Sequence, residues 1–273
     1  MAVRIDQRLV ELGLAESRAK AQAMIELGLV TLQRPNTEPG TATKASLRIG
    51  PEVALVVDRK AHDQPVSRAA FKFDALIEAA GLDMTDSLCI DAGQSTGGFT
   101  ERLIDQGVRY VLGVEVGHGQ LASKLRSHDR VGCLEQTNIK SCTRELLAHF
   151  LMLESQSALS ERLLNNGADI VSADLSFISL RKVMPTLAAL LADSGHLLAL
   201  VKPQFELGPG AVNRRGIISD KKQLGALRHE FEHALALSGL QMIHWLSSPI
   251  TGSDGNTEFL MHAHRRSAPS LRQ

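Results

Sequence analysis

The chain has 273 residues, 44% of them hydrophobic, and its 30 basic residues balance 30 acidic ones. This length allows one α/β domain plus a small additional domain, and the balanced charge excludes an overall positive field as the means of binding nucleic acid. Three scattered cysteines exclude a disulfide framework, and because no apolar run approaches the ~18 residues that span a bilayer and no signal peptide is recognisable, we expect a cytoplasmic protein without a membrane role.

Residues 1–57 predict a small module of two helices followed by strands. The first helix ends at Gly13, and the second runs from Ser17 to Gly28. Strands are expected at 30–32 and 47–57, on either side of a Pro/Gly turn. The basic side chains on the two helices are either solvated surface charges or contacts to phosphate groups. These side chains are Arg4, Arg8, Arg18 and Lys20.

The two helices resemble the S4 RNA-binding domain. The resemblance is carried by Arg4-Ile-Asp-x-x-Leu-Val-x-x-Gly, by Ser17-Arg-x-Lys-Ala and by Ile25-x-x-Gly-x-Val. The family usually continues with an Asn-Gly turn after its first strand, whereas this chain has Gln33-Arg-Pro-Asn. The resemblance implies that the basic residues of the module bind RNA.

From residue 58 onwards the pattern becomes that of an α/β domain. Residues 58–67 are polar and contain proline, which is typical of a linker, and Ser67 caps a helix that runs to Gly81. Strands and helices then alternate, which predicts a mostly parallel sheet covered on both faces within residues 68–273. We expect strands at 88–90, 110–114, 131–134, 169–172, 197–201, 242–246 and 258–263, and helices at 98–107, 120–125, 143–164, 182–191 and 221–237.

A glycine-rich turn follows the first strand of this sheet, at residues 91–100. The second glycine of a dinucleotide fingerprint is replaced by Ser95, and no lysine follows Gly97-Gly98 as it would in a phosphate-binding loop. Because Glu115 ends the next strand and can accept hydrogen bonds from ribose hydroxyls, the pattern favours a nucleoside without phosphates, such as S-adenosylmethionine. The alternative is that the glycines only allow strand and helix to pack closely.

Four charged residues lie where the strands of such a sheet would meet a ligand. Asp174 and Lys202 follow apolar strands, Glu258 begins the last strand, and Lys72 lies on the leading helix. A sugar hydroxyl needs a base, and a lysine can serve when burial or a second cation lowers its pKa. We therefore expect the four residues to be catalytic, the alternative being two unrelated surface ion pairs.

These four residues resemble the Lys-Asp-Lys-Glu tetrad of FtsJ-type ribose 2′-O-methyltransferases. Together with the S4-like module, the stretches 91–100, 173–180, 201–206 and 255–260 make the chain similar to the TlyA or hemolysin A family. The resemblance implies a Rossmann-like methyltransferase sheet and S-adenosylmethionine-dependent 2′-O-methylation of cytidine in ribosomal RNA or ribosomal subunits. It also implies that Lys202 is the base or hydroxyl-orienting group.

The same resemblance assigns the cofactor site. It places the methionine part of the cofactor on the glycine loop, its ribose at Glu115 and its adenine near Asn138. The family usually has Asp at position 115, Tyr at His118 and Arg at Gln136. The residues expected to bind the cofactor are Asp91, Gly93, Ser95, Thr96, Gly97, Gly98, Phe99, Glu115 and Asn138.

One metal motif is present, since His229-Glu-Phe-Glu-His233 fits the His-Glu-x-x-His pattern of zinc enzymes. A catalytic zinc needs a third protein ligand, which nothing downstream identifies, so we interpret both histidines as solvated and expect no metal.

Two other classes of function compete with the enzyme. One is a catalytically inactive RNA-binding protein that assists ribosome assembly, which the intact tetrad disfavours. The other is a membrane-active hemolysin, which the lack of an apolar span and of a strongly basic amphipathic helix disfavours.

Overall fold

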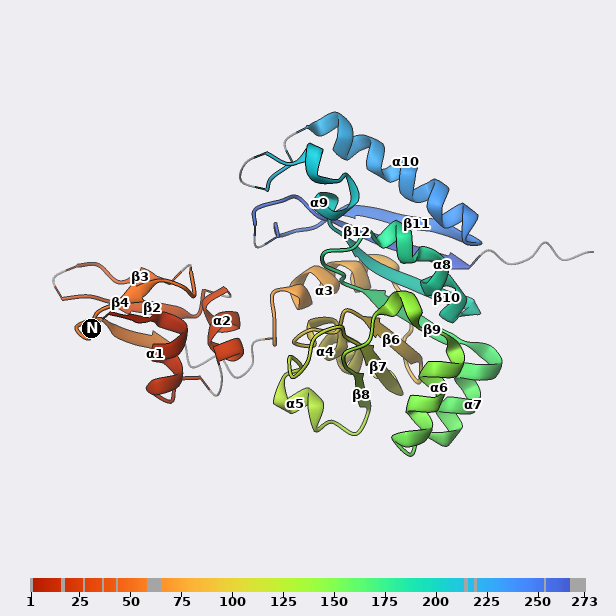
Figure 1. Ribbon diagram of the computed structural model, residues 1–273, viewed down its shortest axis with the longest axis horizontal. Helices are drawn as coiled ribbons and strands as arrows, with labels where there is room; N and C mark the ends of the chain where they lie inside the picture. Colours follow the sequence, from red (N-terminus) through yellow and green to blue (C-terminus); the bar gives the residue numbers. More distant parts are fainter. Residues whose placement is uncertain are drawn as a thin grey trace, which may run out of the picture. The chain divides into compact units, whose positions relative to one another are not determined.

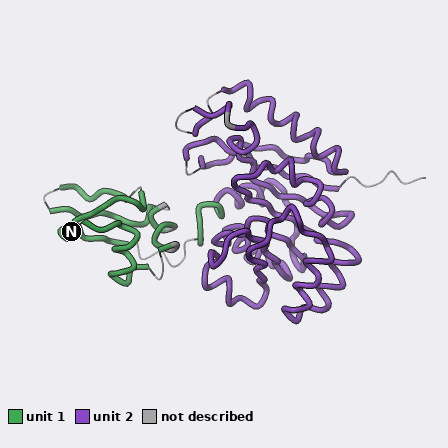
Figure 2. The backbone as a smooth tube through the Cα atoms, in the orientation of Figure 1, with its two compact units in different colours: residues 1–70 green, residues 71–273 purple. Residues whose placement is uncertain are grey.

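The computed structural model divides the chain into two units, residues 1–70 and 71–273 (Figure 2). Most of the predicted linker, residues 58–64, lies outside the described part of the chain. None of the described helices is long and apolar enough to cross a membrane. The structure describes residues 2–15, 18–26, 28–35, 37–42, 44–57, 65–213, 216–218, 220–252 and 254–265.

The smaller unit combines two helices with short antiparallel strands. Strand β2 lies between β3 and β5 in a three-stranded sheet, and β1 pairs with β4. Ile5 and Leu9 of the first helix are fully buried and pack with Ile25 of the second and Val30 of β2, so one apolar core joins helices and sheet. The elements are β1 (Val3–Arg4), α1 (Ile5–Glu11), α2 (Arg18–Glu26), β2 (Val30–Gln33), β3 (Gly40–Thr41), β4 (Arg48–Ile49) and β5 (Ala54–Val57).

The larger unit contains a seven-stranded sheet in the order β11-β12-β10-β9-β6-β7-β8 (Figure 1). Strands β6 to β10 pair in parallel, whereas β12 runs antiparallel to both β10 and β11. This arrangement confirms the expected mostly parallel sheet. The strands are β6 (Leu88–Ala92), β7 (Tyr110–Val114), β8 (Val131–Leu134), β9 (Ala168–Ala173), β10 (Leu191–Val201), β11 (Leu240–Ser247) and β12 (Phe259–Arg265).

Different helices cover the two faces of this sheet. Ile90 belongs to a core that includes Leu187 of α8, whereas the side chain of the next residue, Asp91, meets Thr100 of α4. The stretch 143–164, expected as one helix, forms two, because Ser155 adopts a left-handed φ of 61° between them. The helices are α3 (Ala69–Ala80), α4 (Gly98–Asp105), α5 (Ser123–Arg126), η2 (Ile139–Ser141), α6 (Arg144–Leu153), α7 (Ser157–Asn166), α8 (Leu180–Leu190), α9 (Pro203–Glu206), η3 (Pro209–Ala211) and α10 (Lys221–Leu237).

Candidate active site

The four residues expected to be catalytic form two short ion pairs at the carboxyl ends of the parallel strands. Lys72 Nζ on α3 lies 2.6 Å from Glu258 Oε2, just before β12. Lys202 Nζ, just after β10, lies 2.6 Å from Asp174 Oδ1, just after β9. Both pairs are largely shielded from solvent, since no side chain among the four is more than 19% exposed. The fold thus brings together residues that are up to 186 positions apart in the chain.

The two ion pairs share one electrostatic site. Burial raises the pKa of Glu258, and the positive charges of Lys72 and Lys202 oppose that rise, while the negative charge of Asp174 adds to it. The contact between Lys202 and Asp174 is not aligned as a hydrogen bond, because Asp174 Oδ1 has no hydrogen-bond donor. Lys202 Nζ instead donates to Ser176 Oγ at 2.9 Å. Lys202 thus has one ionic partner and one hydrogen-bond acceptor, both on the loop that follows β9.

The glycine loop touches the catalytic strand end through its backbone. Gly93 has a φ of +82°, and a Cβ there would lie 2.6 Å from the carbonyl oxygen of Asp174. Gly97 has a φ of +95°, and a Cβ there would lie 2.3 Å from Leu125 Cδ1. Both positions favour glycine because of the left-handed φ, and Gly93 also leaves no space for a Cβ against the backbone of Asp174. The loop is locked at the edge of the sheet where the ion pairs lie.

Asp91 is buried beneath this loop and links three elements. Its Oδ2 accepts a hydrogen bond from Thr100 Oγ1 of α4 at 2.7 Å, and its Oδ1 accepts one from Ser172 Oγ of β9 at 2.8 Å. Burial raises the pKa of Asp91 to about 6, and the two hydroxyl groups limit that rise. Gln94 Nε2 donates to Thr100 Oγ1 at 3.0 Å and extends the network. Both carboxylate oxygens of Asp91 thus have partners within the protein.

Glu115 organises the other side of the loop. Its Oε2 accepts a hydrogen bond from the backbone N–H of Ser95, and its Oε1 accepts one from the N–H of Gly117, both at 2.8 Å. Ser95 has a φ of 48°, a left-handed conformation that this bond helps to hold. Each carboxylate oxygen has a second lone pair, so Glu115 can still accept hydrogen bonds from a diol.

The remaining residues expected at the cofactor lie in different settings. The carbonyl of Thr96 accepts a hydrogen bond from the N–H of Ala122, and Gly98 begins α4. Phe99 is only 2% exposed, and its ring stacks on Phe73 of α3 with centroids 4.0 Å apart. Asn138 is exposed, and its Oδ1 accepts a hydrogen bond from the N–H of Lys140 and caps η2. Phe99 thus anchors the helix that carries Lys72.

An exposed aromatic side chain beside the ion pairs was not expected from the sequence. Phe177 is 91% exposed, has a φ of 65° and lies with its ring centroid 5.3 Å from that of Phe205. It follows Ser176, the hydrogen-bond acceptor of Lys202. A left-handed φ at a bulky residue is strained and is typical of functional sites. Neither the exposure nor the φ could have been recognised from residue types alone.

In the smaller unit, two of the expected RNA-binding arginines converge on Asp6. Arg4 binds both carboxylate oxygens of Asp6 at 2.9 Å, and Arg18 lies 3.1 Å from Oδ2. The Asp6 side chain is fully buried, and the hydrogen bonds from Arg4 hold its pKa well below the ordinary value. Arg8 pairs with Glu11 at 3.3 Å, and Lys20 lies in α2, although its side chain is outside the described residues. Arg4 and Arg18 thus have fixed positions but remain 34% and 53% exposed.

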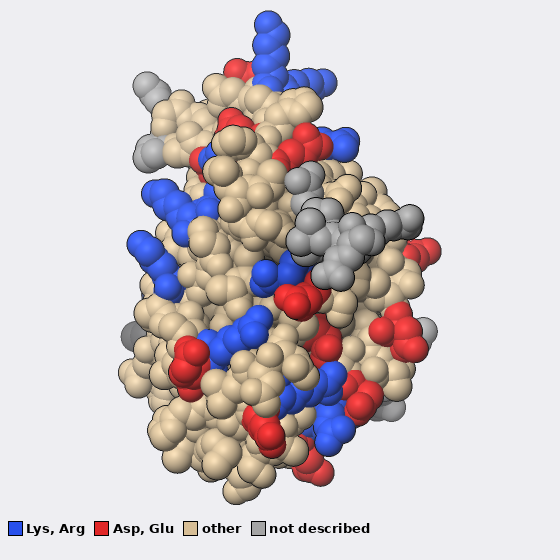
Figure 3. All heavy atoms as spheres, turned by 90° about the vertical axis from the view of Figure 1, so that its right-hand side faces the viewer, with Lys and Arg blue, Asp and Glu red and all other residues tan. Residues whose placement is uncertain are grey.

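Charges of both signs are mixed on one face of the molecule. On the face in Figure 3, Lys and Arg side chains are interspersed with Asp and Glu. His229 of the zinc-like motif is 82% exposed on α10, where its Nδ1 lies 3.1 Å from Glu232 Oε2. On the face in Figure 3, the described residues form no large region of one charge sign.

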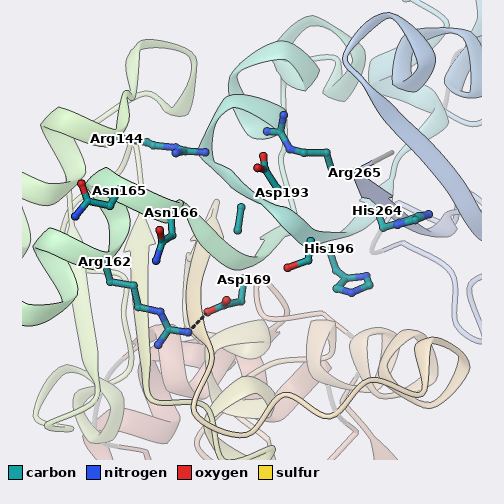
Figure 4. Close-up of a pocket in the computed structure, with 11 residues that line it drawn as sticks. Arg144, Arg162, Asn165, Asn166, Asp169, Asp193, His196, His264 and Arg265 are labelled. Carbon is teal, nitrogen blue, oxygen red and sulfur yellow. Dashed lines mark hydrogen bonds and ion pairs between the residues drawn. The ribbon is translucent and has the colours of Figure 1, made fainter. Parts of the chain in front are cut away.

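A polar pocket of about 980 Å³ lies at the opposite ends of the strands, away from the ion pairs (Figure 4). Arg144 donates to the carbonyls of Ala189 and Leu191, and Arg265 donates to that of Leu191 as well. Arg162 pairs with Asp169 at 2.7 Å. The arginines of this pocket thus neutralise a carboxylate and the carbonyl end of α8, which explains their presence without a ligand.

Comparison with known proteins now decides the family. Residues 65–265 match the FtsJ-like methyltransferase model, and residues 3–33 match the S4 domain. The chain belongs to the FtsJ-like methyltransferases. As the sequence predicted, this methyltransferase is a member of the TlyA and hemolysin A group within them. The protein is therefore an enzyme with an additional S4 domain.

Relatives of known name match nearly the whole methyltransferase. It is 37% identical to the 16S/23S rRNA (cytidine-2′-O)-methyltransferase TlyA of Mycobacterium tuberculosis, over 94% of this chain and 88% of the relative. It is 30% identical to hemolysin A of Brachyspira hyodysenteriae, over 95% and 99% of the two chains. Among solved structures, a putative hemolysin from Streptococcus thermophilus is 31% identical with a TM-score of 0.69, over 98% and 90%.

Proposed function

We propose that the protein transfers a methyl group from S-adenosylmethionine to the ribose 2′-hydroxyl of cytidine in ribosomal RNA. The observation that carries this proposal is the pair of shielded ion pairs, Lys72–Glu258 and Lys202–Asp174, beside a glycine loop at the ligand edge of the sheet. The family supports the methyl transfer, and the name of the Mycobacterium tuberculosis relative supports the nucleoside. We propose that it acts in the cytoplasm, on free RNA or on ribosomal subunits.

The residues present fit S-adenosylmethionine, which would supply an activated methyl group when bound. The loop from Gly93 to Gly98 follows β6 with three left-handed residues, which exposes backbone N–H groups to the methionine part. Glu115 retains acceptor lone pairs for the ribose hydroxyls, and Asn138 follows the next strand on the adenine side. Asp91 acts from beneath the loop, since it fixes the ends of β6 and β9.

Lys202 is the group that we expect to act on the ribose hydroxyl. It lies between Asp174 and Ser176 with a 12% exposed side chain, so it reaches the site but is largely shielded from water. Asp174 neutralises the charge of Lys202, and Glu258 neutralises that of Lys72, so the net charge of the four residues is close to zero. The protein's remaining task is alignment, because a reaction between two bound groups gains most from correct orientation.

Phe177 is suited to contact the base of the target nucleotide. An exposed aromatic ring offers a stacking surface for an unstacked base, which is how many proteins recognise single-stranded RNA. The loop that carries it also carries Asp174 and Ser176. A base stacked on Phe177 would therefore bring its own ribose close to Lys202.

We propose that residues 1–57 form the RNA-binding S4 unit, residues 58–67 the linker and residues 68–273 the methyltransferase domain. Arg4 and Arg18 are held by Asp6 and remain partly exposed, which orients their remaining N–H groups towards phosphate. Arg8 and Lys20 would add positive charge on the same two helices. These contacts would position the RNA without selecting its sequence.

The proposal is tested with Lys202→Ala protein, purified ribosomal subunits and S-adenosylmethionine. Nucleoside mass spectrometry should detect 2′-O-methylcytidine with the wild-type enzyme and a rate lower by roughly 10²-fold with the variant. Lys202→Arg should fail too, because a guanidinium does not give up its proton and has a different shape. Lys124→Ala is a suitable control, since Lys124 is an exposed residue of α5 paired with Glu101. Near wild-type methylation by Lys202→Ala would contradict the proposal.

A further inference from the structure

A buried glutamate joins the two loops that carry the catalytic ion pair. Glu206 is the last residue of α9, four positions after Lys202, and it is 8% exposed. Its Oε1 accepts a hydrogen bond from the backbone N–H of Leu180 at 2.6 Å, and its Oε2 accepts one from Ser179 Oγ at 2.7 Å. Arg181 Nε donates to the same Oε2 at 3.1 Å. One carboxylate thus receives three hydrogen bonds from three consecutive residues.

Glu206 caps the N-terminus of α8, which has no capping hydrogen bond from its own N-cap residue. Ser179 occupies the N-cap position, yet its side chain makes no capping hydrogen bond to the helix. A free N–H end of a helix favours a negative charge, and the carboxylate of Glu206 supplies it from another segment. Arg181 adds a second connection, because its Nη2 donates to the backbone carbonyl of Glu206 at 2.7 Å. The segment 202–206 is therefore fixed to the first turn of α8.

This connection matters because the loop between β9 and α8 carries the reactive groups. Asp174, Ser176 and Phe177 all lie between Ala173, where β9 ends, and Leu180, where α8 begins. At the β9 end, the N–H of Asp174 donates to the carbonyl of Ala92 at 3.0 Å. At the α8 end, Glu206 provides the corresponding anchor. The loop is thus held at both ends, with the strained Phe177 between them.

The ion pair between Lys202 and Asp174 cannot fix this geometry by itself. Its two groups are close but not aligned as a hydrogen bond, so the pair is held by charge attraction, which is less directional than a hydrogen bond. Glu206, in contrast, is nearly inaccessible and binds through well-formed hydrogen bonds. We infer that Glu206 is a positioning residue that sets the place of Lys202 relative to Asp174 and Phe177. This inference rests on the proposed ribose methylation. Glu206 would act through the loop that it binds, not through a contact with the reacting atoms.

The experiment compares Glu206→Ala and Glu206→Gln with Glu230→Gln. Glu230 lies on α10 and pairs with the same arginine, Arg181, but its side chain is 42% exposed, whereas that of Glu206 is buried. Single-turnover methylation at saturating RNA and cofactor should fall by roughly tenfold to a hundredfold in Glu206→Ala, the scale for misplaced reacting groups. Glu206→Gln, which keeps an acceptor oxygen, should fall less, and Glu230→Gln should stay near the wild-type rate. Cofactor affinity should change by less than about twofold in all three, because the glycine loop is untouched.

Three outcomes would overturn the inference. The first is a wild-type rate in folded Glu206→Ala or, if that variant does not fold, in folded Glu206→Gln. The second is a rate deficit that disappears on cooling to a temperature at which the variant is fully folded, since this would show a role in stability alone. The third concerns amide hydrogen exchange of residues 175–180, which should be faster in Glu206→Gln than in Glu230→Gln. This measurement needs no methylation, so equal exchange would overturn the inference even if the wild-type protein proved inactive and the proposed function failed.

Discussion

Replacing Asp91 by Asn should make the larger unit lose stability in mild acid, whereas the wild-type protein should change little. The reason is that the pKa shifts of two buried groups change the free energy of unfolding in opposite directions as the pH falls. Burial raises the pKa of Asp91 to about 6 from 3.8. Burial, together with the neighbouring imidazoles of His196, His244 and His264, lowers the pKa of His262 to about 4 from 6.5. His262 is 2% exposed, and its ring nitrogens lie 3.0 Å from His196 Nδ1 and 3.2 Å from His244 Nδ1.

The two titrations oppose each other between pH 6.5 and 4. Asp91 binds a proton more readily in the folded state, so its contribution is fully present below about pH 4 and is lost as the pH rises through 6. His262 binds a proton less readily when folded, so its contribution is present above about pH 6.5 and is lost as the pH falls towards 4. Each pKa shift exceeds 2 pH units, so the complete titration of each group changes the free energy of unfolding by about 3 kcal/mol. Between pH 7.5 and pH 4.5 the change is about 2 kcal/mol for each group.

Urea unfolding at pH 7.5, 6, 5 and 4.5 would measure this balance. Trp245 is the single tryptophan of the chain and packs between Phe231 and Phe259, so its fluorescence reports on the larger unit. Relative to wild type, Asp91→Asn should lose about 2 kcal/mol between pH 7.5 and 4.5, and His262→Gln should gain about as much. Groups common to all variants, such as Glu258 with its raised pKa, cancel in the comparison. Parallel pH profiles for wild type and both variants would refute the reasoning.

Three further changes test the cofactor site, the RNA-binding unit and the base contact. Glu115→Ala should weaken S-adenosylmethionine binding by roughly 1 to 3 kcal/mol in calorimetry, because charged acceptors for the ribose are lost; unchanged affinity would contradict its assignment. Deletion of residues 1–57 should preserve cofactor affinity but remove a strongly salt-dependent part of RNA binding, so an unchanged salt dependence would speak against the S4 assignment. Phe177→Ala should lower methylation by roughly tenfold or more with cofactor affinity unchanged, whereas Phe177→Trp should retain much of the rate, since stacking contributes about 1 to 3 kcal/mol per base; equal rates for the two variants would exclude stacking.

The fold and the meeting of the charged residues at the strand ends could be predicted because both depend on regular features of sequence, whereas the catalytic role of these residues stays a prediction. Alternating strands and helices indicated the parallel sheet, and the sheet in turn indicated that Asp174 and Lys202, which follow adjacent strands β9 and β10, would meet. Glu206 ends the stretch 201–206 that carries part of the family resemblance, but nothing in the sequence indicated what its side chain contacts. It lies in a four-residue helix, and its partners begin another helix 25 or more positions earlier, so neither periodicity nor strand ends could connect them.

The pairing of Arg4 and Arg18 with Asp6 in the S4 domain could not be predicted from residue types either. On charge alone, Arg4 and Arg18 fit solvated surface groups better than phosphate contacts, because the module also carries acidic residues. The structure adds that both bind the buried carboxylate of Asp6, which lies near Arg4 in sequence but 12 positions from Arg18. A shared buried partner fixes the spacing between two guanidinium groups. A charge count does not reveal this shared partner.

Position relative to a strand's end distinguishes carboxylates that lie beyond the sheet from one that lies within it. Glu115 and Asp174 each come directly after the last residue of a strand, Val114 and Ala173, so they lie beyond the sheet. Asp91 is the fourth residue of β6 and is followed by Ala92, so its side chain points to a face of the sheet, where α4 covers it. Asp91 lies one residue before the end of its strand, whereas Glu115 and Asp174 lie one residue after the end of theirs, and this difference of two positions places the Asp91 carboxylate as a buried link between β6, α4 and β9. The sequence shows that each acidic residue lies near the end of a strand. The exact end of each strand is set by its hydrogen bonds to neighbouring strands, which the sequence does not show.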